Sequence, residues 1–260
     1  LLDVIDKTIS PMGSRLLKRW LALPLKEIAK IRERHQVVAY LQSHPEVLQQ
    51  MQRQIRLISD LERLISKVAT GRIGPKELVA LKESLDAILP IKDWALASPQ
   101  EAVRVLGDSL QACDVLREKI ATTLQTEPPV SIAKGNAIRA GVHEELDALR
   151  KIAYSGKEYL EGIEKRESER TGISSLKIAF NNVFGYYIEV RNTHKDKVPH
   201  DWIRKQTLVN AERYITEELK EYETKILGAE EKIQHIESRL FEVLVSWVGS
   251  YIKPVQTNAQ

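Results

Sequence analysis

The residues best suited to chemistry lie between Ser174 and Arg213, and the chemistry they suit is contact with phosphate. Lysine and arginine neutralise phosphate oxygens, while asparagine, glutamine and threonine donate hydrogen bonds that fix a nucleic-acid backbone without reading its sequence. The candidate side chains are Asn181, Asn182, Arg191, Lys195, Lys197, Arg204, Lys205, Gln206, Thr207 and Asn210.

A plainer interpretation of the same residues stays open. Asn181 and Asn182 can simply shape a turn, because asparagine tolerates positive φ. Arg204 and Lys205 can be a solvated face, and Asn210 can be the N-cap of the helix that follows it. The sequence does not choose between these interpretations.

The net charge of the chain is located in this segment. The 260 residues carry 39 Lys and Arg against 36 Asp and Glu, which leaves only +3. The segment from Ser174 to Arg213 holds seven basic and four acidic residues, so the remaining residues balance at 32 of each sign. An excess of this size points toward an anionic partner without establishing one.

No other chemistry is indicated. The six histidines have no zinc-ligand spacing, and Cys113, the single cysteine, supplies neither a thiolate cluster nor an intrachain disulfide. Cys113 is expected to be a small buried residue inside a helix. The adjacent carboxylates Glu144-Glu145 and Glu230-Glu231 fall on solvent-facing helical positions. We therefore expect no catalytic residues and no metal site.

An ATP site is also not expected. A phosphate-cradling loop needs Gly-x-x-x-x-Gly-Lys-Ser/Thr. The only Gly-Lys pair, Gly156-Lys157, has Lys151 in place of the first glycine and Glu158 in place of the hydroxyl residue. We expect this chain to bind no cofactor and to be no enzyme.

The composition favours a helical, water-soluble protein. Hydrophobic residues make up 43% and charged residues 29% of the chain, which is enough for a core, and glycine and proline are scarce. No apolar run approaches the roughly 20 residues that cross a bilayer. One cysteine and no signal peptide predict a cytosolic location. The start at Leu1 without methionine suggests a piece of a longer protein.

Helical patterns fill the first half of the chain. Apolar spacing, caps and prolines predict six helices: Pro11–Leu23 with Ser14 as N-cap candidate, Leu25–Ser43, one from Pro45, Asp60–Gly71, one from Pro75 closed by Pro90, and Pro99–Leu124. Together they predict a helical bundle.

Two heptad seams follow, and each needs a partner. The first seam consists of Val142, Leu146, Leu149, Ala153, Gly156, Leu160 and Ile163. The second consists of Ile215, Leu219, Tyr222, Ile226, Ala229, Ile233, Ile236, Leu240, Val243 and Trp247. Because a compact segment joins the two helices, the simplest arrangement packs them antiparallel against each other.

The joining segment has the alternation of strands. Leu176–Phe180 and Tyr186–Val190 predict a hairpin, and a third stretch, Ile203–Val209, completes a small sheet. Tyr186 and Tyr187 can be a base-stacking platform, although packing of the sheet is favoured. The predicted fold is mainly α: a helical bundle core with a long antiparallel two-helix arm that bears a small antiparallel β tip.

Several uninterrupted motifs carry a resemblance that covers essentially the whole chain. They are Phe180-Asn181-Asn182, Gly185–Glu189, Arg204–Tyr214, Glu218–Glu223, Pro11–Leu17, Asp60–Arg63 and Glu167–Gly172. In the order that they have along the chain, these motifs closely resemble the MutS family of bacterial DNA mismatch-repair proteins.

The resemblance implies a lever and clamp region of such a protein. Residues 1–156 and 217–260 would form a discontinuous core or lever domain, and residues 157–216 an inserted clamp domain that holds the backbone of double-stranded DNA without sequence preference. ATP and Mg²⁺ sites, homodimerisation and a MutL-type partner would belong to the full-length protein, located in the bacterial cytoplasm with the nucleoid. The alternative is a coiled-coil scaffold whose tip binds a protein.

Overall fold

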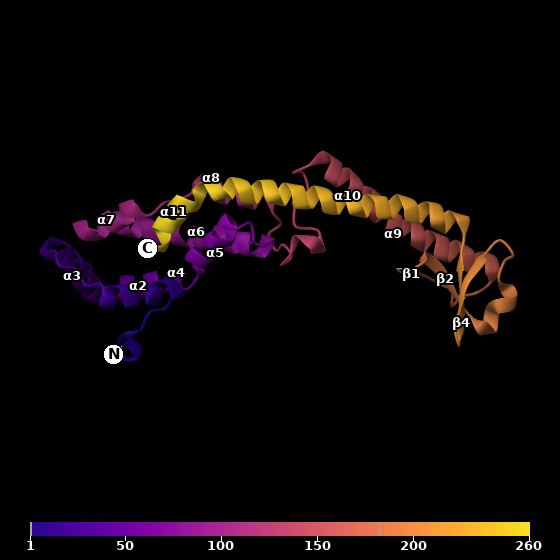
Figure 1. The fold of residues 1–260 in the computed structure, drawn as a ribbon, viewed down its shortest axis with the longest axis horizontal. Coiled ribbons are helices and arrows are strands. Elements are labelled where there is room, and N and C mark those ends of the chain that lie inside the picture. Colours follow the sequence, from indigo (N-terminus) through magenta and orange to yellow (C-terminus); the bar gives the residue numbers. More distant parts are fainter. Residues whose placement is uncertain (1, 182) are drawn as a thin grey trace. The chain divides into compact units, whose positions relative to one another are not determined.

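The protein is mainly α-helical, with one small antiparallel sheet, as the sequence predicts (Figure 1). The computed structural model describes residues 2–181 and 183–260. The chain forms two compact units: Leu1–Val142 with Glu237–Gln260, and His143–Ile236. The predicted clamp segment, residues 157–216, lies inside the second unit, and the domain boundaries themselves stay a prediction.

The first unit is built from helices. In chain order they are α1 (Leu2–Ile5), α2 (Pro11–Ala22), α3 (Ile28–Ser43), α4 (Pro45–Ile55), α5 (Leu61–Ala69), α6 (Pro75–Leu96), α7 (Glu101–Ser109), α8 (Asp114–Thr123), the short η1 (Ile132–Lys134), η3 (Gly249–Tyr251) and α11 (Ile252–Ala259). Leu61, Leu81, Leu116 and Ile120 are fully buried in its core. Helix α6 packs against α5, α7 and α8, while α11 packs against α5.

The start of α2 differs from the prediction. Its N-cap is Ser10, whose Oγ accepts a hydrogen bond from the Gly13 N–H at 3.1 Å. Ser14 lies inside the helix and donates to Asp6 Oδ2 at 2.6 Å. The prediction of Ser14 as the cap is wrong because Pro11 occupies the first helical position, which places the cap one residue before it.

Pro90 does not close α6 as predicted, since the helix continues to Leu96. A proline inside a helix removes a hydrogen bond and costs about 3 kcal/mol. Packing of the last turn offsets this cost, because Ala95 is buried where Gly107 of α7 comes close. A methyl group added at Gly107 would lie 2.9 Å from the Cβ atom of Ala95.

The single helix predicted for Pro99–Leu124 is two helices, α7 and α8. Cys113 separates them as the N-cap of α8, with a left-handed backbone (φ 51°), and it is half-buried, not fully buried. A residue of α11 holds the chain at this break. Gln111 N–H donates to Asn258 Oδ1 at 2.7 Å, and Asn258 Nδ2 donates to the Gln111 carbonyl oxygen at 2.9 Å.

The second unit contains a helix pair and the sheet. Its elements are α9 (Glu144–Thr171), β1 (Lys177–Asn181), β2 (Gly185–Arg191), the short η2 (Asn192–Lys197), β3 (Ile203–Thr207), β4 (Ala211–Ile215) and α10 (Glu217–Val248), whose residues from Glu237 belong to the first unit.

Helices α9 and α10 run antiparallel within this unit, as predicted. Tyr159 of α9 donates a hydrogen bond to Glu218 near the start of α10, whereas Gly156, which comes earlier in α9, meets Tyr222 and Ile226 further along α10. Leu219, Tyr222 and Ile226 are buried, which confirms the seam over this stretch.

The prediction for the later part of the second seam is wrong. Val243 is 62% exposed, whereas Glu237, Phe241, Leu244 and Val248 are buried. A straight α-helix drifts about 20° per heptad relative to a strict seven-residue repeat, so the buried stripe moves off the predicted positions. In addition, this end of α10 belongs to the other unit and buries a different face.

The sheet has four strands in the order β1-β2-β4-β3, all antiparallel (Figure 1). The predicted hairpin is β1 and β2, with Ala179 opposite Tyr187. The predicted third strand is β3. The sequence analysis does not predict β4, whose last residue, Ile215, is the first residue of the predicted second seam. β4 takes the central position between β2 and β3.

One face of the sheet packs on the helix pair. Its cluster of buried residues consists of Ile163, Ile173, Leu176, Ile188, Val190, Trp202, Tyr214 and Leu219. Because α9, α10, β2, β4 and the segments before β1 and β3 all contribute, the sheet is fixed at the end of the helix pair.

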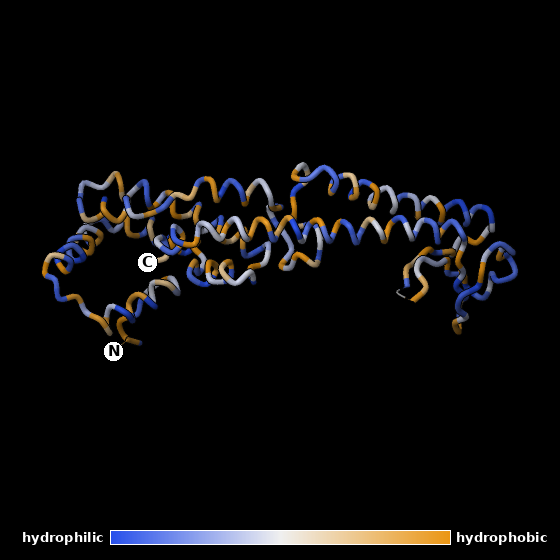
Figure 2. Tube along the Cα trace, turned by 45° about the horizontal axis from the view of Figure 1, so that its top comes forward, coloured by the Kyte–Doolittle hydropathy of each residue, from blue (hydrophilic) through white to orange (hydrophobic). Residues whose placement is uncertain are grey.

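Hydrophobic and hydrophilic residues alternate along the helices (Figure 2). Among the helices of residues 2–181 and 183–260, none has the length and apolar character required to cross a membrane.

Candidate nucleic-acid interface

Most of the predicted phosphate-binding residues come together around β3 and η2. Arg204, Lys205, Gln206 and Thr207 form most of β3, an edge strand, while Lys195 and Lys197 lie in η2. Arg191 ends β2 and pairs with Ala211, next to Asn210 in the β3–β4 turn. We call Arg191, Lys195, Lys197, Arg204 and Lys205 the basic surface.

The turn between β3 and β4 is held by a residue that the sequence analysis missed. Asn192 donates its backbone N–H to the Asn210 carbonyl oxygen at 3.1 Å and its Nδ2 to the Val209 carbonyl oxygen at 2.9 Å. The available signal was an asparagine two residues after the predicted strand Tyr186–Val190, where its side chain often bonds a nearby backbone. Asn192 therefore joins η2 to the turn, in which Val209 is 92% exposed.

Lys205 lies at an irregularity of the edge strand. Arg204 pairs with Tyr214 and Gln206 with Arg213, so two steps along β3 match one step along β4 and Lys205 is the extra residue. A bulge and a lysine on an edge strand both discourage another strand from pairing there. Lys205 is exposed, which suits contact with a partner that is not a β-strand.

Arg204 forms an ion pair across the two strands. Its Nη1 lies 3.2 Å from Glu212 Oε1, and Tyr214 donates its hydroxyl to the other carboxylate oxygen. The hydrogen bond from Tyr214, followed by the charges of Arg204 and Lys195, lowers the pKa of Glu212. Burial, followed by the bond to Glu212, raises the pKa of Tyr214 to about 12. Glu212 is thus ionised and Tyr214 neutral at physiological pH.

Arg213 contributes to the positive charge of the segment, but its guanidinium is bonded to other residues of the sheet. It bonds Glu189 Oε2 at 3.0 Å and Gln206 Oε1 at 3.0 Å, and its guanidinium lies 4.4 Å from the centre of the Tyr187 ring. Its side chain is only 20% exposed. Gln206 therefore has a structural partner, and its contact with phosphate stays a prediction.

The other cations of the basic surface are unpaired. Arg191, Lys195, Lys197 and Lys205 are exposed, and none forms an ion pair with another described residue. Thr207 is also exposed at the end of β3. These charges are therefore available to an anionic partner.

Asn181 lies apart from this group. It ends β1 opposite Gly185, at the other end of β2 from Arg191, which is roughly 20 Å along the strand. Its Oδ1 accepts a hydrogen bond from the Val183 N–H at 2.8 Å, which is the turn-shaping role. Asn182 lies outside the described residues.

Asn210 does not cap α10. The helix begins at Glu217, and Thr216 Oγ1 accepts a hydrogen bond from the Leu219 N–H at 3.2 Å. The capping interpretation of Asn210 is wrong because β4 separates it from the helix. Asn210 is exposed in the turn, beside the basic surface.

Tyr186 and Tyr187 pack the sheet, as the favoured interpretation predicts. Tyr187 is buried beneath Arg213 and contacts Phe184, with 5.5 Å between ring centres. Tyr186 packs against the buried cluster and lies 6.0 Å from the ring of Tyr222. Neither ring offers an open platform for a base.

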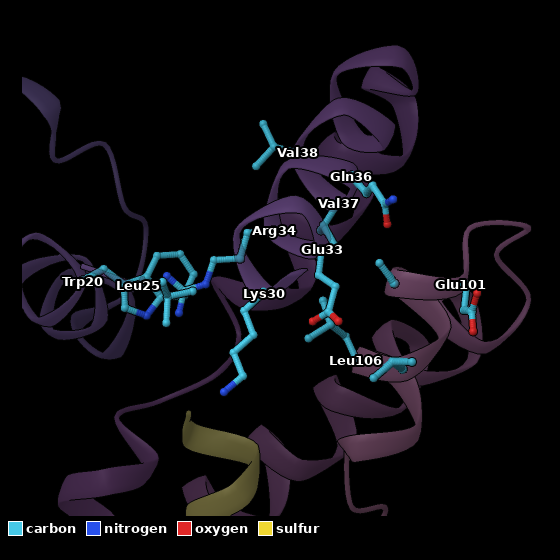
Figure 3. A pocket seen from close by; sticks show the side chains of 12 residues that line it. Trp20, Leu25, Lys30, Glu33, Arg34, Gln36, Val37, Val38, Glu101 and Leu106 are labelled. Carbon is cyan, nitrogen blue, oxygen red and sulfur yellow. The ribbon is translucent and has the colours of Figure 1, made fainter. Parts of the chain in front are cut away.

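A cavity of about 740 Å³ lies in the first unit, between α2, α3 and α7 (Figure 3). Its lining is mainly apolar, and Arg34 lies over the Trp20 ring at 3.5 Å from the ring centre. Glu33 and Lys30 are the other charges beside Arg34 on α3. The lining contains no histidine, cysteine or aspartate, so we assign no reaction to this cavity.

The described residues contain no cluster of three or more His, Cys, Asp or Glu side chains that could hold a metal ion. Burial raises the pKa of the Cys113 thiol, which makes it a poor nucleophile.

Comparisons with known proteins give one consistent result. Residues 1–260 match the family model described as MutS domain III. The chain is 76% identical to proteins named DNA mismatch repair protein MutS from Flavobacterium psychrophilum and Flavobacterium johnsoniae, and 64% identical to the protein of that name from Christiangramia forsetii. Each match covers the whole chain but only 30% of the relative's length.

Proposed function

Because the chain belongs to the MutS family, as its domain III, we propose that its basic surface binds the backbone of duplex DNA without reading the sequence. One observation carries the proposal: four exposed cations that form no ion pair with another described residue lie near a turn that Asn192 fixes. Phosphate contacts of this kind position a protein on DNA but specify no bases.

We also propose that the helix pair acts as a lever. Helix α10 begins directly after the sheet and continues without a break to Val248, and its residues from Glu237 belong to the unit that contains α1 to α8 and α11. A continuous helix suits a connection to an ATPase region elsewhere in a longer protein. ATP and Mg²⁺ binding, homodimerisation and contact with a MutL-type partner belong to this proposal for the longer protein.

The first test is duplex binding as a function of salt. Fluorescence anisotropy of a labelled, fully paired duplex is measured with the 260-residue chain at increasing salt. We expect weak binding, with Kd on the order of 10⁻⁴ to 10⁻⁶ M near physiological salt. Binding is expected to weaken as salt is added, because the release of counterions from the DNA becomes less favourable. No binding even at low salt would overturn the proposal and favour a scaffold whose tip binds a protein.

A matched pair of variants locates the surface. Lys205→Ala is expected to weaken binding to all duplex sequences alike and to reduce the salt slope by about one. Lys232→Ala makes the same charge change at an exposed position of α10 and is expected to leave the slope unchanged. Equal losses in both variants, or a changed sequence preference in Lys205→Ala, would contradict the assigned role.

A further inference from the structure

One cation of the basic surface, Arg204, already has a carboxylate partner in Glu212. Arg204 is 61% exposed and its guanidinium bonds Glu212 at 3.2 Å. The other four cations of the surface form no ion pair with a described residue. Arg204 is therefore the one member of the basic surface, among the described residues, whose charge is already matched by a carboxylate.

Glu212 is the fixed partner of this pair. Its side chain is only 13% exposed, and Tyr214, which is itself buried against Trp202 with 5.8 Å between ring centres, donates a hydrogen bond to it. Glu212 also lies on β4, a central strand held by both β2 and β3. The hydrogen bond from Tyr214 holds the carboxylate of Glu212 in place, whereas Arg204 contacts it from the edge strand β3.

We propose that Glu212 competes with DNA phosphate for Arg204 and so limits how tightly the basic surface binds the duplex. A carboxylate and a phosphate both accept charge-assisted hydrogen bonds from a guanidinium. Glu212 occupies Nη1 of Arg204 and offsets its positive charge, so it weakens the attraction of Arg204 for a phosphate. The exposed side chain of Arg204 can exchange Glu212 for a phosphate without moving the strand. This inference rests on the function proposed above.

The test compares Glu212→Gln with a matched control. Glu212→Gln keeps the size of the side chain and removes its charge, which frees Arg204. Because exposed ion pairs are weak, we expect about 2- to 5-fold tighter duplex binding and a steeper salt slope. Glu189→Gln makes the same change at the partner of Arg213, whose guanidinium stays bonded to Gln206 and stacked on Tyr187, and is expected to have a smaller effect.

Two further variants separate this mechanism from a general change in charge. Glu212→Asp keeps the charge but draws the carboxylate back from Arg204, and it is expected to tighten binding in the same direction. The gain from Glu212→Gln is expected to disappear in an Arg204→Ala background. Circular dichroism confirms the fold of each variant, and a tighter-binding variant cannot be explained by loss of structure.

The outcomes distinguish the inference from the function on which it rests. If the unmodified chain binds duplex and Lys205→Ala weakens it, but neither Glu212 variant tightens binding, the competition is wrong and the function stands. A gain that persists without Arg204 also overturns the competition. If the unmodified chain and Glu212→Gln both fail to bind at low salt, the proposed function itself fails.

Discussion

At the residue scale, identical residue types have different roles because their neighbours differ. Arg204 and Arg213 each face a glutamate across the sheet, but Arg204 is 61% exposed and Arg213 only 20%. Arg213 also stacks on Tyr187. A count of charges along the sequence treats both arginines as available cations. In the structure, Arg204 is accessible to an anionic partner, whereas Arg213 is not.

Asp60 joins two roles in one side chain. It caps α5 by accepting a hydrogen bond from the Arg63 N–H at 3.2 Å, and it forms a two-pronged ion pair with Arg15 of α2 at 2.7 and 2.9 Å. Asp60→Ala removes both interactions and is expected to lower the free energy of unfolding by about 1–2 kcal/mol. Asp60→Asn keeps the cap, and we expect it to lower the free energy of unfolding less than Asp60→Ala does. Urea denaturation measures both variants.

The same pair predicts a dependence on pH. The hydrogen bond from Arg15 lowers the pKa of Asp60 below its ordinary value, so the folded state binds this proton less tightly than the unfolded chain does. The stabilisation is present above the unfolded pKa, near 4, and is lost as pH falls through the lowered folded value. The advantage over Asp60→Asn should therefore shrink in acid; a constant difference would contradict the ion pair's role.

At the element scale, the contact between α9 and α10 depends on a glycine. A methyl group added at Gly156 would lie 2.3 Å from the Tyr222 hydroxyl oxygen and 2.5 Å from Ile226 Cδ1. Tyr222 cannot easily move away, because its ring lies 5.1 Å from that of Tyr159 and 6.0 Å from that of Tyr186. The glycine lets the two helices approach closely at this point.

Gly156→Ala and Gly162→Ala form a matched pair in α9. Alanine is favoured over glycine in a helix by up to about 1 kcal/mol, and a side chain at Gly162 would meet no atom within 4 Å. Gly162→Ala is therefore expected to raise the free energy of unfolding. Gly156→Ala is expected to lower it by about 1 kcal/mol or more through overpacking. Denaturant titration measures both, and equal stabilisation would show that Tyr222 moves aside freely.

At the scale of the whole molecule, burial is uneven along the chain. Among residues 2–60, which include α2, α3 and α4, no described side chain is buried, whereas α5, α6 and α8 supply the core of the first unit. Exposed apolar residues in this region include Trp20, Leu21, Leu23 and Ile28. The helices before Leu61 therefore gain little of their stability from a core within this chain.

Hydrogen exchange should reveal this difference. Amides of α2 and α4 are expected to exchange faster than those of α5 and α8, because helices with few buried contacts open locally at a lower free energy. Mass spectrometry after short labelling times measures each peptide separately. Equal protection across the four helices would contradict the prediction that α2 and α4 open at a lower free energy than α5 and α8.

Short-range patterns in the sequence are enough to predict the class of elements and much of their order. The amphipathic helices, the β1–β2 hairpin and the antiparallel pairing of α9 with α10 all follow from short-range periodicity, which depends on residues a few positions apart. The same local signals selected the cations of the basic surface. They misplaced the cap of α2, the end of α6 and the second half of the α10 seam, where packing overrides local preference.

The partners of these residues, in contrast, depend on how distant segments pack together. The break between α7 and α8 depends on Asn258, which lies 147 positions from Gln111, and the β3–β4 turn depends on Asn192 across two strands. Whether Arg204 faces Glu212 or solvent depends on the register of β3 against β4. Spacing along a chain carries no record of contacts between distant segments, because the packing of whole elements creates them.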